Sequence, residues 1–193
     1  MVMVESTMLA LGTKAPAFEL TDVISGIPVT LETFKDRKAL LIMFICVHCP
    51  FVKHVEQELA NIGHDYGAKD LGILAISSNS VATHPQDAPE HMQTQAKAQK
   101  FEFPYGYDET QSIAKAYTAA CTPDFFLFDA NLALAYRGQL DDSRPSNGKP
   151  VTGKDLRAAI DVVLAGQVIE TTQVPSVGCN IKWVPGQAPD YFG

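Results

Sequence analysis

The sequence predicts an α/β fold in which a central sheet carries helices on both faces. Two apolar runs of strand length, residues 38–45 and 71–77, have the pattern of strands that are buried on both sides. Between them, residues 51–66 repeat apolar side chains at steps of three and four, which predicts a helix with one buried face. A strand, a helix and a strand in this order predict a right-handed parallel crossover.

The segment before this unit, residues 10–36, is rich in loop residues. It contains two short extended pieces, 18–20 and 28–31, which lie on either side of the turn signal Ser25-Gly26. We expect the two pieces to pair as a β-hairpin at the edge of the domain.

Two helices are predicted after the second buried strand. Asp87 and Glu90 have the spacing of a capping box, which predicts a helix over residues 88–100. Asp108 is read in the same way as the cap of a shorter helix over residues 109–117. Each prediction assigns the aspartate a local role at the start of the helix that follows it.

The last regular elements are a hairpin and a helix. Residues 124–129 and 133–138 read as two strands joined by a short turn, which predicts antiparallel pairing. Thr152 with Asp155 predicts the start of a helix that reaches residue 164. This helix has apolar residues at the spacing of a single buried face.

Periodicity is lost after this helix. Residues 167–193 carry three of the twelve prolines, Cys179 and the only tryptophan, Trp183. We interpret residues 1–166 as one domain and residues 167–193 as an irregular C-terminal extension that packs on it.

Composition excludes several classes of partner. The net charge of -7 and the pI near 5.1, without a basic stripe, argue against nucleic acid. No run approaches the roughly 18 apolar residues that a membrane span needs. The N-terminus has no basic segment before its apolar residues, so no secretory signal is expected. Four cysteines are too few for a disulfide-stapled secreted protein, and we expect a cytoplasmic location.

The sequence Cys46-Val47-His48-Cys49-Pro50 follows the first buried strand and opens the first long helix. Backbone N–H groups at a helix start are unpaired and stabilise a thiolate. We therefore expect a lowered pKa at Cys46, which would act as the nucleophile, and resolution of the mixed disulfide by Cys49. A protonated His48 between the thiols would favour the Cys46 thiolate and make the disulfide more oxidising. Pro50 suits the first helical turn.

Metal binding and simple packing are the alternatives for this pair. A structural zinc site usually has a second Cys/His pair at ligand spacing, and the other two thiols, Cys121 and Cys179, are single and far apart. A soft-metal site would use Cys46 and Cys49, with His54 on the same helix as a further ligand. Cys-x-x-Cys within a strand–helix–strand unit favours redox chemistry, for which no bound cofactor is needed.

Three segments together resemble the thioredoxin superfamily in its redoxin branch, to which peroxiredoxins belong. They are residues 12–20, the strand that leads into Cys46-Val47-His48-Cys49-Pro50, and residues 122–129; the likeness spans about residues 10–165. The resemblance implies a thioredoxin-like three-layer α/β/α sandwich with an N-terminal β-hairpin. It also implies that Thr122-Pro123 forms a loop with a cis proline beside the thiols, where its backbone would pair with an extended substrate.

Two departures from the family patterns narrow the function. Thioredoxin has Trp before the first cysteine and Gly-Pro between the pair, whereas this chain has Ile45, Val47 and His48. Peroxiredoxins have Pro seven residues and Thr three residues before the peroxidatic cysteine. The corresponding residues are Ile42 and Cys46 when counted from Cys49, or Ala39 and Met43 when counted from Cys46. Neither register supplies the hydroxyl that positions peroxide.

The sequence therefore predicts a thiol-disulfide oxidoreductase that uses Cys46, Cys49 and His48 and binds its substrate at Thr122-Pro123. The expected substrate is a thiol or disulfide protein, or a small-molecule disulfide. A peroxiredoxin-like peroxidase and a soft-metal binding protein are the alternatives. Cys121 and Cys179 are open between an auxiliary redox pair and buried packing residues. The oligomeric state and the direction of electron flow are not predicted.

Overall fold

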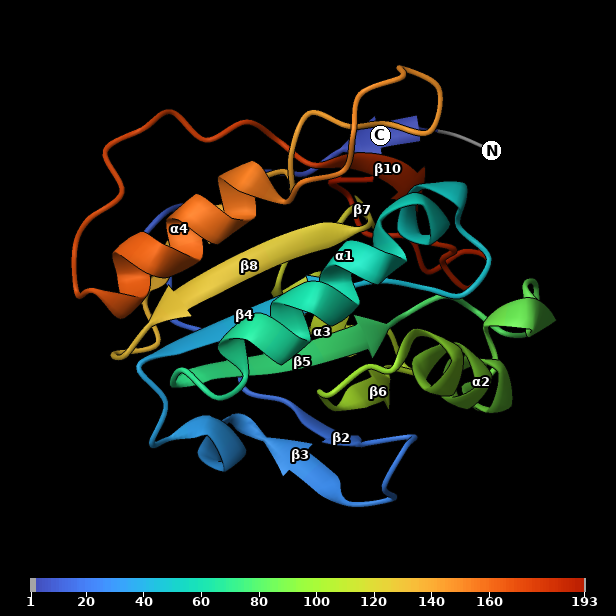
Figure 1. The fold of residues 1–193 in the computed structure, drawn as a ribbon. Helices are drawn as coiled ribbons and strands as arrows, with labels where there is room; N and C mark the ends of the chain where they lie inside the picture. The colour runs from blue at the N-terminus through green and yellow to red at the C-terminus, as the bar shows by residue number, and fades with distance from the viewer. Residues whose placement is uncertain (1–2, 193) are drawn as a thin grey trace.

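The computed structural model describes residues 3–192 and is built on a five-stranded mixed sheet in the order β6-β5-β4-β8-β9 (Figure 1). The central strand β4 (Ala39–Phe44) pairs in parallel with β5 (Leu71–Ser77) and antiparallel with β8 (Asp124–Asp129). The outer strands are β6 (Tyr105–Tyr107), parallel to β5, and β9 (Leu134–Arg137), antiparallel to β8. The predicted crossover and the predicted hairpin of β8 and β9 are confirmed.

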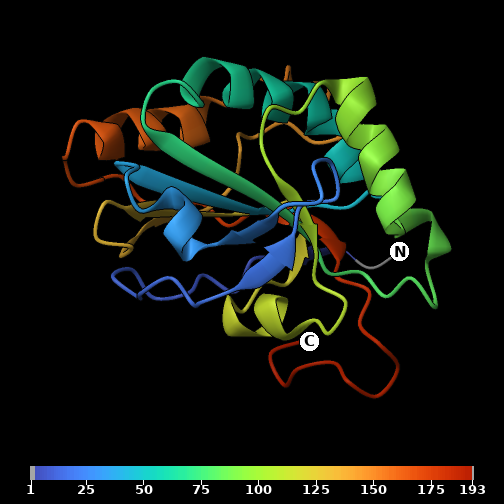
Figure 2. The same cartoon turned by 90° about the horizontal axis from the view of Figure 1, so that it is seen from below.

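Helices cover both faces of this sheet, as Figure 2 shows. One face carries α1 (Pro50–Tyr66), α2 (Pro89–Gln99) and α4 (Lys154–Leu164), and the other carries the short α3 (Ser112–Ala116). The predicted hairpin of β2 (Glu19–Thr21) and β3 (Pro28–Thr30) packs on the same face as α3. It is followed by the 3₁₀ turn η1 (Leu31–Phe34).

Strand β4 separates the two halves of the core because its successive side chains point to opposite faces. Leu41 and Met43 belong to the cluster that contains α1 and α4, whereas Ile42 and Phe44 belong to the cluster that contains α3. All six residues of β4 are buried, which explains the continuous apolar run in the sequence. This strand and its helix α1 fix the position of the cysteine loop between them.

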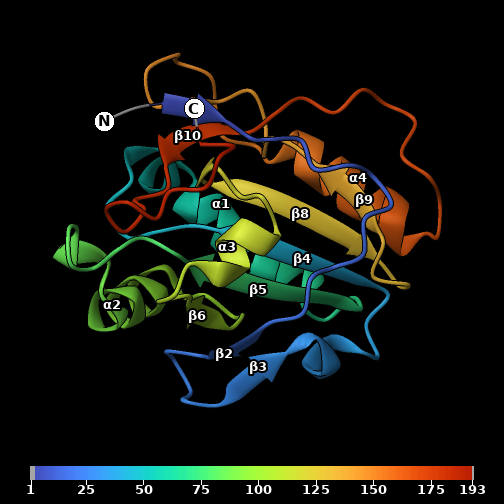
Figure 3. The same cartoon turned by 180° about the vertical axis from the view of Figure 1, so that it is seen from behind.

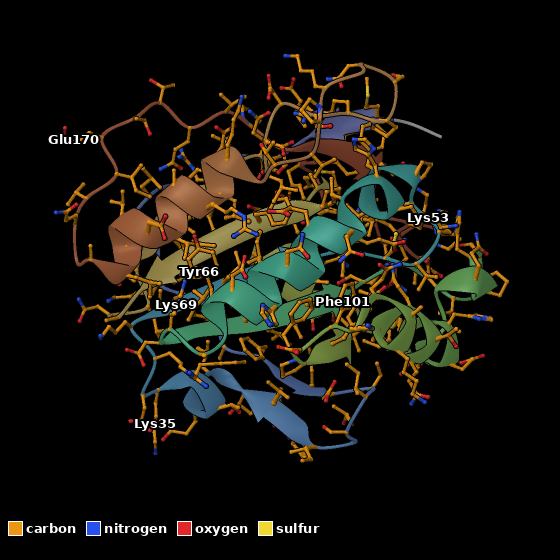
Figure 4. All side chains as sticks on the ribbon, viewed as in Figure 1. Lys35, Lys53, Tyr66, Lys69, Phe101 and Glu170 are labelled. Carbon is orange, nitrogen blue, oxygen red and sulfur yellow. The ribbon has the colours of Figure 1, made fainter. Side chains whose placement is uncertain are left out.

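Helix α1 has 17 residues and ends at Tyr66, close to the predicted boundary. The Tyr66 hydroxyl donates a hydrogen bond of 2.9 Å to Asp161 on α4, and Figure 4 shows Tyr66 between the two helices. Within residues 3–192, no helix is both long enough and apolar enough to cross a lipid bilayer.

The predicted capping roles of the aspartates are wrong in detail. Helix α2 begins at Pro89 with Ala88 as its N-cap residue, and the Asp87 carboxylate makes no cap bond, because it points to the cysteine loop instead. Helix α3 begins at residue 112 rather than 109, since Gln111 adopts a left-handed conformation with φ of 60°. The Asp108 carboxylate still accepts a hydrogen bond from the backbone N–H of Ala114.

The start of α4 is also one residue later than the predicted cap. Gly153 is the N-cap residue, with φ of 64°, in place of Thr152. The Asp141 carboxylate accepts hydrogen bonds from the backbone N–H groups of Thr152 and Gly153, at 2.6 and 2.7 Å. The start of α4 is thus stabilised by the Asp141 carboxylate from the preceding loop, and not by the local cap predicted at Thr152.

A second sheet joins the two ends of the chain. Its order is β1 (Met3–Glu5), β10 (Val177–Asn180) and β7 (Cys121–Thr122), and all pairings are antiparallel (Figure 3). Strand β10 was not predicted, because its partners β1 and β7 are far away in the sequence and no hairpin turn marks the pairing. The rest of the extension is largely irregular, as expected, and Figure 4 shows its Glu170 on the opposite side of the molecule from Lys53 at the start of α1.

Candidate active site

The cysteine loop lies between the end of β4 and the start of α1. Cys49 is the N-cap residue of α1, and Pro50 occupies the first helical position, where its missing N–H leaves no bond unmade. The backbone N–H of Val52, one of the donors that a helix start leaves unpaired, contributes to lowering the pKa of Cys49. Both cysteine side chains are fully buried. The predicted placement of the thiols is confirmed, and their catalytic role stays a prediction.

The loop that contains Thr122 and Pro123 lies directly against both thiols. The Thr122–Pro123 peptide bond is cis, as the family resemblance implies. The Cys46 Sγ lies 3.4 Å from the Thr122 Oγ1, and the Cys49 thiol donates to the Thr122 carbonyl oxygen at 3.2 Å. The structure thus brings together four of the residues that the sequence singled out.

The third thiol at this position is Cys179. Its strand β10 pairs with β7 so that Cys179 stands opposite Thr122, the residue that both Cys46 and Cys49 contact, and Cys179 shares one buried cluster with them. Cys121 is the register partner of Asn180, and its thiol donates to the Pro123 carbonyl oxygen at 3.5 Å. All four cysteines of the chain are buried free thiols.

The pairing of β10 with β7 changes two expectations from the sequence. Neighbouring residues of a strand point to opposite faces, so Cys121 and Cys179 face away from each other, and the structure does not bring them together as an auxiliary pair. The backbone of Thr122, which was expected to pair with an extended substrate, already pairs with Cys179. An outside substrate can therefore use this edge only after β10 has left it.

The direction of the two pKa shifts differs from the sequence prediction. Burial, followed by the hydrogen bond with Cys49, raises the pKa of Cys46 well above its usual value. Hydrogen bonds from Cys179 and Cys46 lower the pKa of Cys49, although burial opposes them. The expected low pKa at Cys46 is therefore wrong for the closed form of the site. The physical reason is that several donors converge on Cys49, whereas at Cys46 burial outweighs the one hydrogen bond, with Thr122, that lowers its pKa.

Asp87 is the site residue that the sequence interpretation missed. Its side chain is fully buried on the 3₁₀ turn η2 (Pro85–Asp87). Its Oδ1 accepts hydrogen bonds from the backbone N–H groups of Val47 and His48, at 2.9 and 3.0 Å. Its Oδ2 lies 2.5 Å from His48 Nδ1 and accepts a bond of 2.8 Å from Asn79. Asp87 thus holds the loop between the two cysteines.

The charge of Asp87 is stabilised by these donors. Burial raises the pKa of Asp87, but the hydrogen bonds from His48 and Asn79 outweigh it and leave the pKa below its usual value. A signal for this contact was present in the sequence. Parallel strands end at the same edge of a sheet, so the loop after β5, which contains Asp87, must approach the loop after β4. The backbone N–H groups of the loop after β4 need a hydrogen-bond acceptor when they are buried.

The His48 ring is directed to Asp87 and stacks on His84, with 5.1 Å between the ring centroids. A ring nitrogen of His48, the Cys46 Sγ and a carboxylate oxygen of Asp87 lie within 4.8 Å of one another. A charge on His48 would thus act on Cys46 beside a carboxylate of opposite sign, which itself raises the pKa of Cys46. The tuning role predicted for His48 stays a prediction.

The same three residues are the one group of metal-ligand type found among residues 3–192. Asp87 already accepts two hydrogen bonds at each oxygen, so a metal ion would have to displace donors that hold the loop. His54, the ligand suggested by the sequence, is not in the group, since its Nε2 lies 2.7 Å from the Ser143 hydroxyl. The predicted set of Cys46, Cys49 and His54 is not assembled.

Comparisons with known proteins fit this geometry. The AhpC/TSA family matches residues 11–137. The chain is similar to the structure of an uncharacterized conserved protein from Geobacillus kaustophilus, with 54% identity, a TM-score of 0.94, and 96% of this chain and 98% of that chain covered. It is also similar to a hypothetical protein from Sinorhizobium meliloti 1021, with 50% identity, a TM-score of 0.92, and 94% and 99% covered. Among curated proteins there is no match.

More distant structures share the fold. The thioredoxin domain of a thiol-disulfide oxidoreductase from Bacteroides vulgatus is 19% identical, with a TM-score of 0.61, and the alignment covers 79% of this chain and 96% of that chain. At this identity the likeness shows the fold alone. The thioredoxin-like α/β/α sandwich expected from the sequence is thereby confirmed.

Proposed function

The chain belongs to the AhpC/TSA family, and on this premise we propose that it is a thiol-disulfide oxidoreductase that works through a reversible disulfide between Cys46 and Cys49. The observation that supports the proposal most strongly is that both thiols, which lie at the start of helix α1, contact Thr122. The proposed substrate is a protein disulfide or a small-molecule disulfide. A cytoplasmic location stays a prediction from composition.

The exchange transfers two electrons. One cysteine thiolate attacks a substrate disulfide, the S–S bond breaks, and one substrate sulfur leaves as a thiolate that takes up a proton. The second cysteine loses its proton and attacks the mixed disulfide, which releases the other substrate sulfur and forms the Cys46–Cys49 bond. The substrate is reduced to two thiols, and the enzyme is oxidised.

We assign the first attack to Cys46, in the open form of the site. Both sulfurs are buried in the closed form, so a substrate disulfide reaches them only when the site opens. Exposure removes the burial that chiefly raises the pKa of Cys46. Departure of β10 also removes the hydrogen bond from Cys179, which is the main cause of the lowered pKa of Cys49. Both changes move the thiolate toward Cys46.

Peroxide reduction is a second candidate, because the Thr122 hydroxyl lies 3.4 Å from the Cys46 sulfur. In the peroxiredoxin motif the threonine hydroxyl comes from three residues before the reactive cysteine. Here the hydroxyl group near Cys46 comes from Thr122, far away in the sequence. In this reaction the Cys46 thiolate would break the O–O bond, water would leave, and Cys49 would condense with the sulfenic acid to form the same disulfide.

A redox titration tests the proposal. The protein is equilibrated in glutathione buffers of graded ratio, its free thiols are alkylated, and its intact mass is measured beside peroxide consumption and metal content. We expect one two-electron couple, lost in Cys49→Ser and kept in Cys121→Ser, without rapid turnover of peroxide. Four free thiols at every ratio would contradict the proposal. Rapid peroxide loss that requires Cys46 would favour the second candidate, and stoichiometric metal that protects the thiols would exclude both.

A further inference from the structure

Strand β10 brings a third sulfur to the thiol pair. Cys179 is 1% exposed and stands opposite Thr122, whose carbonyl oxygen accepts the Cys49 thiol at 3.2 Å. Cys179 shares one buried cluster with Cys49 and Cys46, and its thiol is near enough to Cys49 for each to shift the pKa of the other. Cys49 is therefore placed between two possible disulfide partners.

The chain on both sides of Cys179 is anchored. Before it, the Ser176 hydroxyl donates a hydrogen bond of 2.7 Å to the Gly138 carbonyl oxygen. After it, the backbone N–H of Lys182 donates to the Asn79 side chain at 2.8 Å, and Asn79 in turn donates to Asp87. The anchor at Lys182 thus connects the chain after Cys179 to the network that holds the loop between Cys46 and Cys49.

Close contact between β10 and β7 requires glycine at position 178. A Cβ atom added there would collide with the Thr122 carbonyl group and would lie 3.2 Å from the Pro123 nitrogen. Glycine allows the strand to approach the proline loop as closely as a neighbouring backbone can. The approach places the Cys179 sulfur on the face of Thr122, toward Cys49, while Cys121 points to the other face.

We propose that Cys179 is a second disulfide partner of Cys49, so that the site works with three thiols instead of two. This inference rests on the proposed thiol-disulfide exchange and adds a residue to it. In the internal step, the Cys179 sulfur loses its proton and attacks Cys49 of the Cys46–Cys49 disulfide. The bond between Cys46 and Cys49 breaks, a Cys49–Cys179 bond forms, and Cys46 leaves as a thiolate that takes up a proton.

The internal exchange consumes no oxidant, because one disulfide replaces another. It returns Cys46 to the thiol form, and the enzyme as a whole remains oxidised by two electrons. It also ties β10 covalently to the start of α1, at the edge where an extended substrate would pair with Thr122. A thiol reductant that opens Cys49–Cys179 by disulfide exchange, and is itself oxidised to a disulfide, would then restore all the thiols of the site.

The test uses the full chain with Cys46→Ser, which leaves Cys49, Cys121 and Cys179. The variant is oxidised with oxidised glutathione, alkylated, and analysed by intact mass and by peptide mapping without reduction. Matched variants are Cys46→Ser with Cys179→Ser and Cys46→Ser with Cys121→Ser. We expect an intramolecular Cys49–Cys179 disulfide in the single variant and in the pair with Cys121→Ser. With Cys179→Ser the linked fraction should fall at least about tenfold, and glutathione adducts should replace it.

Two results would overturn the inference: only glutathione adducts in Cys46→Ser, or a linkage that includes Cys121. A thermal melt and the near-ultraviolet circular dichroism of each variant establish that it is folded, and Cys46→Ala replaces Cys46→Ser if that variant is not. Wild-type protein in the same buffers separates the two claims. A Cys46–Cys49 disulfide there, without Cys49–Cys179 in the variants, leaves the proposed function in place and removes the role of Cys179. If neither Cys46–Cys49 nor Cys49–Cys179 forms in the wild type, the proposed exchange through Cys49 is itself contradicted.

Discussion

Cys49 lies between two sulfurs that reach it in different ways. Cys46 belongs to the same short loop and is held there by the buried carboxylate of Asp87. Cys179 comes from the far end of the chain and is held by the pairing of β10 with β7. The first pair needs little more than a correctly folded loop, whereas the second depends on a docked strand. The two pairs should therefore respond differently to changes in the strand, the loop and the pH.

Removal of the shared sulfur should have the largest effect. In Cys49→Ser, neither Cys46 nor Cys179 has a partner, and the rate of disulfide exchange should fall by about a thousandfold or more. The measurement is the steady-state reduction of oxidised glutathione with a thiol reductant in excess. Cys121→Ser should retain the rate of the wild type, because Cys121 faces away from the site. A Cys49→Ser protein that keeps a tenth of the activity, about tenfold below wild type, would break the comparison.

Asp124, next to the proline loop, and Asp87, next to the cysteine loop, should make stability depend on pH in opposite directions. Burial raises the pKa of Asp124, next to the proline loop, to about 7, and its Oδ1 has no hydrogen-bond partner among the described residues. The unfolded chain loses this proton near pH 3.8, so the folded protein binds more protons between the two values. The free energy of unfolding should therefore fall by up to about 4 kcal/mol as the pH rises through this window.

Chemical denaturation of the wild type and Asp124→Asn at pH 5 and pH 8 measures this effect. The fall toward pH 8 should be largely absent in the variant, and an equal fall in both proteins would contradict the role of Asp124. Asp87 should act in the other direction. Hydrogen bonds lower its pKa in spite of burial, so its contribution is present above its unfolded pKa and is lost as the pH falls through its folded pKa.

A side chain at position 178 should prevent the Cys49–Cys179 disulfide and leave the Cys46–Cys49 disulfide intact. Gly178→Val places atoms against the Thr122 carbonyl group, so β10 should lose its pairing with β7 at a cost of about 2 kcal/mol. The Cys49–Cys179 linkage should fall while Cys46–Cys49 still forms. Hydrogen exchange of residues 176–182 and peptide mapping provide the readouts. Val177→Ala, which adds no atom to the same strand, is the control, and loss of both disulfides in Gly178→Val would refute the independence of the pairs.

The smallest effect is expected in the redox potential of Asp87→Asn. Removal of the negative charge should lower the pKa of Cys46, which that charge raises, and so stabilise the reduced form. The Cys46–Cys49 potential should become more oxidising by about 30 mV, which corresponds to about 1.4 kcal/mol. Asp142→Asn, an exposed partner of Lys149 and Lys154, should leave the potential unchanged. A shift toward a more reducing potential would contradict the electrostatic argument.

The difference between local and distant contacts also explains which features could be predicted from the sequence. Strand β4, helix α1 and the cysteines between them were predicted because apolar period and cysteine spacing are local properties. The cis bond before Pro123 was expected only through the family resemblance, since a single X-Pro pair has no local signal for it. Of the main sheet, strands β4, β5, β8 and β9 were predicted from local patterns, together with the primary thiol pair.

Local patterns alone do not predict the contacts of Asp87 and Cys179. Asp87 has the local pattern of a helix cap, and only the tertiary structure directs its carboxylate to the loop of Val47 and His48. Cys179 lies in a short strand whose partners, β1 and β7, are distant in the sequence, so no hairpin signal reveals the pairing. In both cases the deciding interaction joins segments that are far apart in the sequence.

The central claim is that Cys49 is the common sulfur of the disulfides that this site forms. Peptide mapping of the wild-type protein without reduction, at each step of a glutathione titration, tests it most directly. Every intramolecular linkage of the folded protein should contain Cys49, with Cys46 or Cys179 as its partner. A Cys121–Cys179 linkage in folded protein, or a linkage of Cys46 to Cys179 that leaves Cys49 free, would contradict the claim.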